Sequence, residues 1–186
     1  MPETHAEIEP PHPLDGRSTG ASRTCQLVRA GLFCAVIDGL WAIVLTVVYG
    51  RTVLGLFQGI AETVFGSSML ESGAPSALLG LAIHFAVAFA WSAVFVAQVA
   101  SSPWLRRLLA TWTGVLGVAA VYGPVVWVVM SAGVIPLLTG APLSITPRWW
   151  IQLLGHVVFV GLPIVGSVAW DERRRDRALA ATGPRF

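Results

Sequence analysis

Charged residues are scarce in this chain, and lysine is absent altogether. Charged residues make up 12% of the 186 residues, whereas a soluble domain carries roughly 25%. A hydrophobic fraction of 55% accompanies this deficit. This composition indicates lipid rather than water as the main solvent, and it argues against an ordinary soluble domain.

Features of several other protein classes are missing as well. The two cysteines, Cys25 in a polar segment and Cys34 in the first apolar run, do not suit a disulfide, so we expect two free thiols. The net charge of +2 and the lack of a basic stripe with interleaved aromatics give no case for nucleic-acid binding. The chain has no Gly-rich phosphate loop, paired-cysteine zinc pattern, nucleophile elbow or His-Glu-x-x-His helix. The sequence therefore does not support an enzyme.

The few charges that are present separate long apolar runs. Between Arg29 and Arg51 the only charged residue is Asp38. Three further runs of similar or greater length follow, and none of them contains a charged residue. Each run can hold a helix of about 20 residues, the length that a hydrocarbon core of about 30 Å requires. The sequence predicts an all-α protein, a bundle of four transmembrane helices at residues 28–49, 76–100, 108–130 and 149–170.

The segments outside this membrane domain, which we place at residues 28–170, are polar. Residues 1–27 hold four prolines among charged and small residues, and we expect a disordered tail there. Residues 171–186 are expected to form a short basic tail. Because a long polar stretch precedes the first apolar run, we interpret that run as a retained helix and not as a cleaved signal peptide.

The two longer connections are predicted to touch the membrane surface. Over residues 53–65 the apolar side chains recur at helical spacing, and Gln58 and Glu62 fall on the opposite side. This pattern predicts an amphipathic interfacial helix between helices 1 and 2, too short to cross the membrane. Residues 131–148 contain three prolines, so we expect irregular, half-immersed backbone throughout that segment.

The arginines are distributed unevenly between the two ends of the predicted bundle. If the N-terminus is inside, ten of the twelve arginines lie on the inner side, and only Arg51 and Arg148 lie outside. The positive-inside rule then places both termini in the cytoplasm.

One acid and two histidines lie deep within the predicted helices: Asp38 in the first, His84 in the second and His156 in the fourth. Asp38 is near the middle of its helix, and both histidines are about 4 to 8 Å to the outer side of theirs, at about 1.5 Å per residue. A polar group that faces lipid alone costs several kcal/mol. We therefore predict that the three side chains converge, each within direct or single-water hydrogen-bonding distance of another.

Helical spacing adds Trp91 and Gln152 to this predicted polar cluster. Trp91 follows His84 on a stripe that continues to Gln98, and Gln152 lies one turn before His156. These faces are expected to meet protein rather than lipid. A strip of small residues on the second helix is predicted to pack against a neighbour: Ala82, Ala86 and Ala90.

Three interpretations of the cluster stay open. In the leading one the protein is not an enzyme, and the cluster fixes helix register or responds to protons. In the second, His84 and His156 bind haem, or both histidines and Asp38 bind a divalent metal, in a redox protein. In the third, the chain is a small transporter or channel, which at this size needs a homo-oligomer. No cofactor is predicted in the leading case, and the partner in all three is the lipid bilayer.

Several segments match a known pattern. They are the helix that carries Asp38, the amphipathic segment 53–61, and residues 79–85, 122–130, 135–137 and 155–159. In these features the chain resembles a family of uncharacterised bacterial inner-membrane proteins with four helices, distantly similar to the YagU-like proteins. The resemblance covers roughly residues 31–175. It implies this architecture and a location in the bacterial cytoplasmic membrane, and no agreed activity, substrate or cofactor comes with it.

Overall fold

The computed structural model describes residues 15–182, and this part of the chain consists of helices and short connections, with no strand. Within these residues, four helical stretches are long and apolar enough to cross a membrane, which confirms the predicted all-α bundle of four spans. The stretches are Arg23–Val48, Gly73–Ser101, Trp112–Thr139 and Pro147–Ala178. The protein is thus an integral, multi-pass membrane protein.

The helices follow one another with few residues between them. They are α1 (Asp15–Val48), α2 (Val53–Phe65), α3 (Gly73–Ser101), α4 (Pro103–Leu109), α5 (Trp112–Val128), α6 (Ile135–Thr139), α7 (Pro147–His156) and α8 (Leu162–Thr182). A 3-10 turn, η1 (Ser67–Leu70), precedes α3. Two π-helical segments, η2 (Val129–Val134) and η3 (Val157–Gly161), connect α5 to α6 and α7 to α8.

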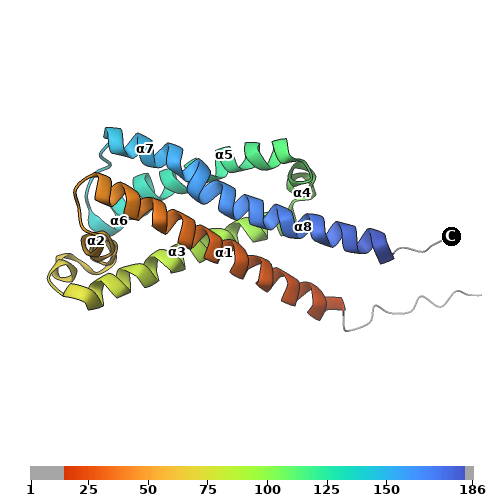
Figure 1. The fold of residues 1–186 in the computed structure, drawn as a ribbon, viewed down its shortest axis with the longest axis horizontal. Helices are drawn as coiled ribbons and strands as arrows, with labels where there is room; N and C mark the ends of the chain where they lie inside the picture. The colour runs from red at the N-terminus through yellow and green to blue at the C-terminus, as the bar shows by residue number, and fades with distance from the viewer. Residues whose placement is uncertain (1–14, 183–186) are drawn as a thin grey trace, which may run out of the picture.

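The spans pack in an uneven arrangement. α1 packs on α3 and on α8, while α5 packs on α7, η3 and α8, and α3 and α5 hardly contact each other. Figure 1 shows that α1 begins and α8 ends at one end of the bundle, here called the terminal end. The opposite end carries α2 and α6 and is called the α2 end. The buried apolar core includes Phe95, Ala119 and Ile164 and holds α3, α5 and α8 together.

α1 begins at Asp15, well before the predicted start of the first helix. The prediction of a disordered tail over residues 1–27 is therefore wrong for residues 15–27, while residues 1–14 lie outside the described part. Near its end the extension contacts α8: the Gln26 amide donates to the Val168 carbonyl at 3.3 Å and to Glu172 Oε1 at 3.1 Å. Arg29 also forms an ion pair with Asp171. Residues 171–182 of the predicted C-terminal tail are helical too.

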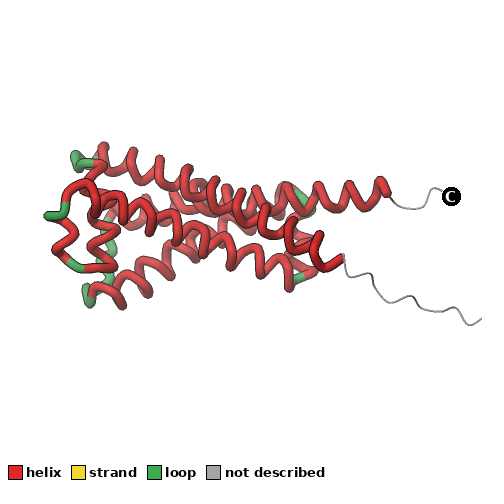
Figure 2. The backbone as a smooth tube through the Cα atoms, turned by 90° about the horizontal axis from the view of Figure 1, so that it is seen from below, coloured by secondary structure: helices red, strands yellow, loops and turns green. Residues whose placement is uncertain are grey.

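α2 confirms the predicted short helix between the first two spans, with the predicted bounds. Figures 1 and 2 show that it runs across the end of the bundle, at a large angle to the spans. It lies so close to α3 that a Cβ on Gly80 would be 1.8 Å from the Phe57 carbonyl oxygen. One detail of the prediction is wrong. Gln58 is buried against α3, where its amide donates to the carbonyls of Leu70 and Gly73.

The connection over residues 131–148 is less irregular than predicted. Helical backbone continues from α5 through η2 and α6 as far as Thr139, and only residues 140–146 lack regular structure. Pro136 lies in the first turn of α6, where a missing N–H does not break the helix. Gly140 ends α6 in the left-handed conformation, with φ of 68°.

Candidate functional site

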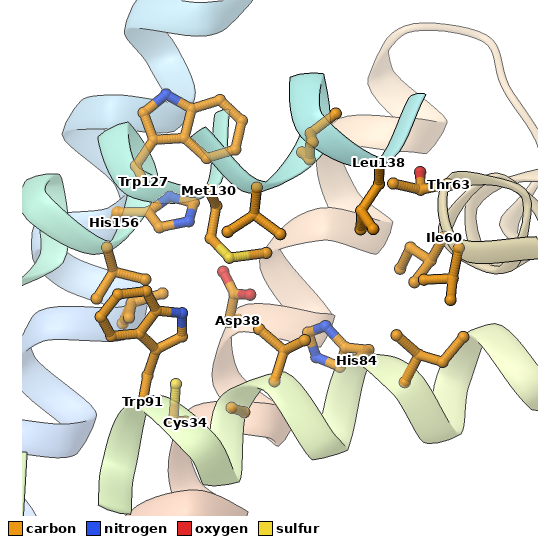
Figure 3. A pocket seen from close by; sticks show the side chains of 18 residues that line it. Cys34, Asp38, Ile60, Thr63, His84, Trp91, Trp127, Met130, Leu138 and His156 are labelled. Carbon is orange, nitrogen blue, oxygen red and sulfur yellow. The ribbon is translucent and has the colours of Figure 1, made fainter. Parts of the chain in front are cut away.

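A cavity of about 270 Å³ lies between the spans, toward the α2 end of the bundle. Four of the five residues predicted for the polar cluster line it, namely Asp38, His84, Trp91 and His156. Figure 3 shows Asp38 from α1 between His156 on one side and His84 on the other. The remaining wall includes Cys34 of α1, Thr63 of α2 and Trp127 of α5. It is otherwise apolar and comes from α2, α3, α5, η2, α6 and η3: Ile60, Val64, Ile83, Val87, Ala88, Val126, Met130, Val134, Ile135, Leu138 and Val160.

His84 is held against α1 by a hydrogen bond to the main chain. Its Nε2 lies 2.9 Å from the carbonyl oxygen of Ala35. Because a carbonyl oxygen only accepts, Nε2 carries the proton, and in the neutral ring Nδ1 is an acceptor. Gly39 makes this close approach possible, since even a Cβ there would lie 3.2 Å from His84 Nε2.

His156 is fixed in the same manner at the end of α7. Its Nδ1 lies 2.7 Å from the carbonyl oxygen of Gln152, so Nδ1 donates and Nε2 is left as an acceptor in the neutral ring. The ring of Trp127 lies beside it, with ring centroids 4.8 Å apart. His156 is one of the few polar side chains that the bundle buries.

Gln152 is the member of the predicted cluster that does not line the cavity. Its side-chain oxygen accepts a hydrogen bond from Trp41 Nε1 at 3.2 Å. Trp41 also stacks on Phe159, with ring centroids 4.4 Å apart. Gly155 permits this, because a Cβ at that position would be 2.6 Å from Trp41 Nε1. Sequence reasoning missed Trp41, although it lies one turn after Asp38 on α1.

The second predicted feature of α3 is also corrected. Ala82, Ala86 and Ala90 are exposed on the outside of the described bundle and do not form a packing strip. Gln98, at the end of the predicted polar stripe, is exposed as well. The close packing of α3 uses a different side of the helix, which includes Gly80, Ala88, Ser92 and Phe95. Small residues therefore occur on both sides of this helix, and their spacing alone does not identify the buried one.

Both π-helical segments border the cavity. Met130 and Val134 of η2 and Val160 of η3 are part of its wall, and η3 begins directly after His156. A π-helical turn inserts an extra residue into a helix, and such turns occur frequently at functional sites. Here the two segments form part of the cavity wall.

A contact between α3 and α5 borders the cavity on the side of the terminal end. The Tyr122 hydroxyl donates to the Trp91 carbonyl oxygen at 2.6 Å. The ring of Tyr122 also packs against Phe95, with centroids 4.7 Å apart. This tyrosine therefore joins two spans that otherwise have few contacts.

Among residues 15–182, no group of three or more His, Cys, Asp or Glu side chains is placed to hold a metal ion. No family model, curated protein or solved structure matches the chain.

Proposed function

We propose that this is a non-enzymatic protein of the bacterial cytoplasmic membrane with a proton-responsive site formed by Asp38, His84 and His156. The observation that carries the proposal is that these side chains come from three separate spans and line one cavity. The resemblance to the YagU-like proteins supports the location, and the arginine distribution supports cytoplasmic termini.

The hydrogen bonds favour a responsive site over a purely structural network. In a structural network each polar group would satisfy another, as buried groups generally do. Here each imidazole donates instead to a main-chain carbonyl. Within residues 15–182, no hydrogen bond or ion pair involves the Asp38 carboxyl group, which leaves it facing the cavity.

A carboxyl group in this position responds to its surroundings. An unpaired carboxylate in an apolar cavity is costly, so it gains a proton or a compensating positive charge. The titratable groups that face it are Cys34 from its own helix, His84 from α3 and His156 from α7. α2 contributes Thr63 and apolar side chains, and α5, η2 and α6 contribute no charge to the wall. A proton taken up here is thus shared among these few groups.

Histidine NMR in detergent or nanodiscs tests the proposal. Replacement of His5 and His12 by glutamine leaves His84 and His156 as the only labelled imidazoles. We expect Asp38→Asn to change the titration midpoint of at least one of them by about one pH unit, which corresponds to about 1.4 kcal/mol of interaction. Glu62→Gln is the matched control, because Glu62 is an acid on α2 outside the cavity wall. Unchanged titration of both histidines in Asp38→Asn would refute the proposal.

The haem or metal interpretation is tested separately. An absorbance spectrum and metal analysis of the purified protein are expected to show neither a haem band nor stoichiometric metal. Either signal, if lost on replacement of His84 or His156, would overturn the proposal in favour of a redox or metal protein.

A further inference from the structure

We infer that the cavity binds a small lipophilic ammonium ion, with its N–H groups directed at Asp38 and the two histidines and its apolar body against the surrounding wall. The inference rests on the proposed site and adds the chemical class of its ligand.

The polar groups of the site require a ligand that donates hydrogen bonds. The N–H of His84 is committed to the Ala35 carbonyl, and the N–H of His156 is committed to the Gln152 carbonyl. In the neutral rings, the free nitrogens are therefore His84 Nδ1 and His156 Nε2, both acceptors. An ionised Asp38 is also an acceptor only. All three principal polar groups thus require hydrogen-bond donors.

A primary ammonium group fits this requirement in both charge and hydrogen bonding. It carries three N–H donors and no acceptor, as a lysine side chain does, and its charge compensates that of Asp38. Hydrogen bonds between ionised partners are roughly twice as strong as neutral ones. A ligand that offers only carbonyl oxygens would place acceptors against acceptors, and an anion would be repelled by Asp38.

The wall of the cavity selects an apolar body rather than a bare inorganic cation. Aliphatic side chains dominate it, including Ile83 and Val87 of α3 and Val126 of α5, and Met130 of η2 is also part of it. Hard metal cations need about six or more oxygen ligands, which this wall does not supply. The indole rings of Trp91 and Trp127 also line the cavity, and aromatic rings attract organic cations.

The size of the cavity limits the ligand to a compact molecule. Its volume is about 270 Å³, just below the range of about 300 to 1,000 Å³ for sites that hold drug-sized ligands. A rigid amine with a single apolar cage, such as 1-aminoadamantane, is therefore a suitable probe.

Calorimetry on the full-length protein in detergent compares three probes of the same shape. We expect 1-adamantylammonium to bind, and 1-adamantanol and 1-adamantanecarboxylate to bind at least about tenfold more weakly, the factor that about 1.4 kcal/mol produces. The alcohol also corrects for partition into the micelle. Binding of the ammonium ion should weaken as the pH is lowered, because protonation removes the charge of Asp38 and turns an acceptor into a donor.

Two pairs of variants locate the binding. Asp38→Asn is expected to weaken ammonium binding at least about tenfold, whereas Glu62→Gln should leave it unchanged. Ile83→Trp should abolish binding by filling the cavity while Asp38 is retained. Leu78→Trp is its control, since Leu78 is exposed on the same helix. If Asp38→Asn does not fold, the inference is still tested by the three probes, by the pH dependence and by the comparison of Ile83→Trp with Leu78→Trp.

Equal affinity for the ammonium ion and the alcohol would indicate an unselective apolar cavity and would overturn the inference. So would binding that survives Ile83→Trp, or no binding of the ammonium ion at any pH. These results are separable from a failure of the proposed function. If the histidine titration depends on Asp38 but no ammonium ion binds, the proton-responsive site stands and its ligand class is wrong.

Discussion

A Cβ atom on Gly123 would lie 2.0 Å from the carbonyl oxygen of His156, so α5 and the start of η3 are in direct main-chain contact. A similar contact follows on the same interface, where a Cβ on Gly161 would lie 2.3 Å from the carbonyl oxygen of Ala119. The absence of a side chain at both glycines therefore fixes the distance of His156 from α5, and with it one wall of the cavity.

Gly123→Ala is predicted to destabilise the bundle. The added methyl group must push η3 away, and such overpacking costs about 1 to 3 kcal/mol. Reversible unfolding in mixed detergent micelles measures this change in free energy. Gly117→Ala on the same helix is the control, because a Cβ there meets nothing within 4 Å. Equal effects of the two substitutions would show that the close approach is unimportant.

Gln58→Met is predicted to loosen α2 from the bundle. The substitution keeps the length of the side chain but leaves the carbonyls of Leu70 and Gly73 without the donor that Gln58 supplies. Ser76 still donates to the Gly73 carbonyl, so the loss is that of the Gln58 hydrogen bonds, each of which contributes about 0.5 to 1.5 kcal/mol. Hydrogen exchange of the α2 amides should become faster, whereas Gln98→Met at an exposed position should leave it unchanged. Unaltered exchange in Gln58→Met would mean that apolar contacts alone hold α2.

The spans and α2 could be predicted from the sequence because a charged side chain is energetically costly in lipid. The position of each run without charged residues therefore indicated where a span lies. The helical backbone of residues 15–27 could not be predicted in this manner. Its last residues contact α8, as Gln26 does with Glu172, and such contacts join residues far apart in the chain. A polar composition indicates low burial, but it does not reveal that another helix will continue alongside.

For the candidate site, depth in the membrane was a better guide than the helical face. Asp38, His84 and His156 were expected at similar depth, and they line one cavity. Gln152 shares a helical face with His156, yet its side chain accepts a hydrogen bond from Trp41. The indole of Trp41 can come this close because Gly155 has no side chain. Residues on the same helical face are possible neighbours. Which of them are actually in contact depends on which helix packs most closely against that face. That information is contained in the packing of glycines against other helices and not in the periodicity.

The ion pair between Arg29 and Asp171 is predicted to hold the terminal ends of α1 and α8 together. Arg29→Asp should destabilise the protein, because it sets two acids side by side in a partly buried position. The double substitution Arg29→Asp and Asp171→Arg should recover part of the loss, since it restores an opposite-charge pair. Coupling between contacting residues is about 0.5 to 3 kcal/mol. A double variant no more stable than the additive sum of the two single variants would exclude a direct interaction.

The final prediction concerns the orientation of the bundle. At the terminal end, arginines bind the last carbonyls of neighbouring helices: Arg106 donates to Val99 and Ala100, and Arg173 donates to Leu109. Arginine at a helix C-terminus satisfies carbonyls that lack a partner in the helix. These positively charged contacts lie at the end that the positive-inside rule assigns to the cytoplasm.

Cysteine accessibility in intact cells tests this orientation. In a background without Cys25 and Cys34, single cysteines are placed at position 10, before the first span, and at position 70, which is exposed at the α2 end. A membrane-impermeant reagent should label only position 70, because the terminal end faces the cytoplasm. Permeabilised cells should show labelling at both positions, which confirms that the cysteine at position 10 is reactive. Labelling of position 10 alone in intact cells would reverse the topology and place the α2 end of the cavity toward the cytoplasm.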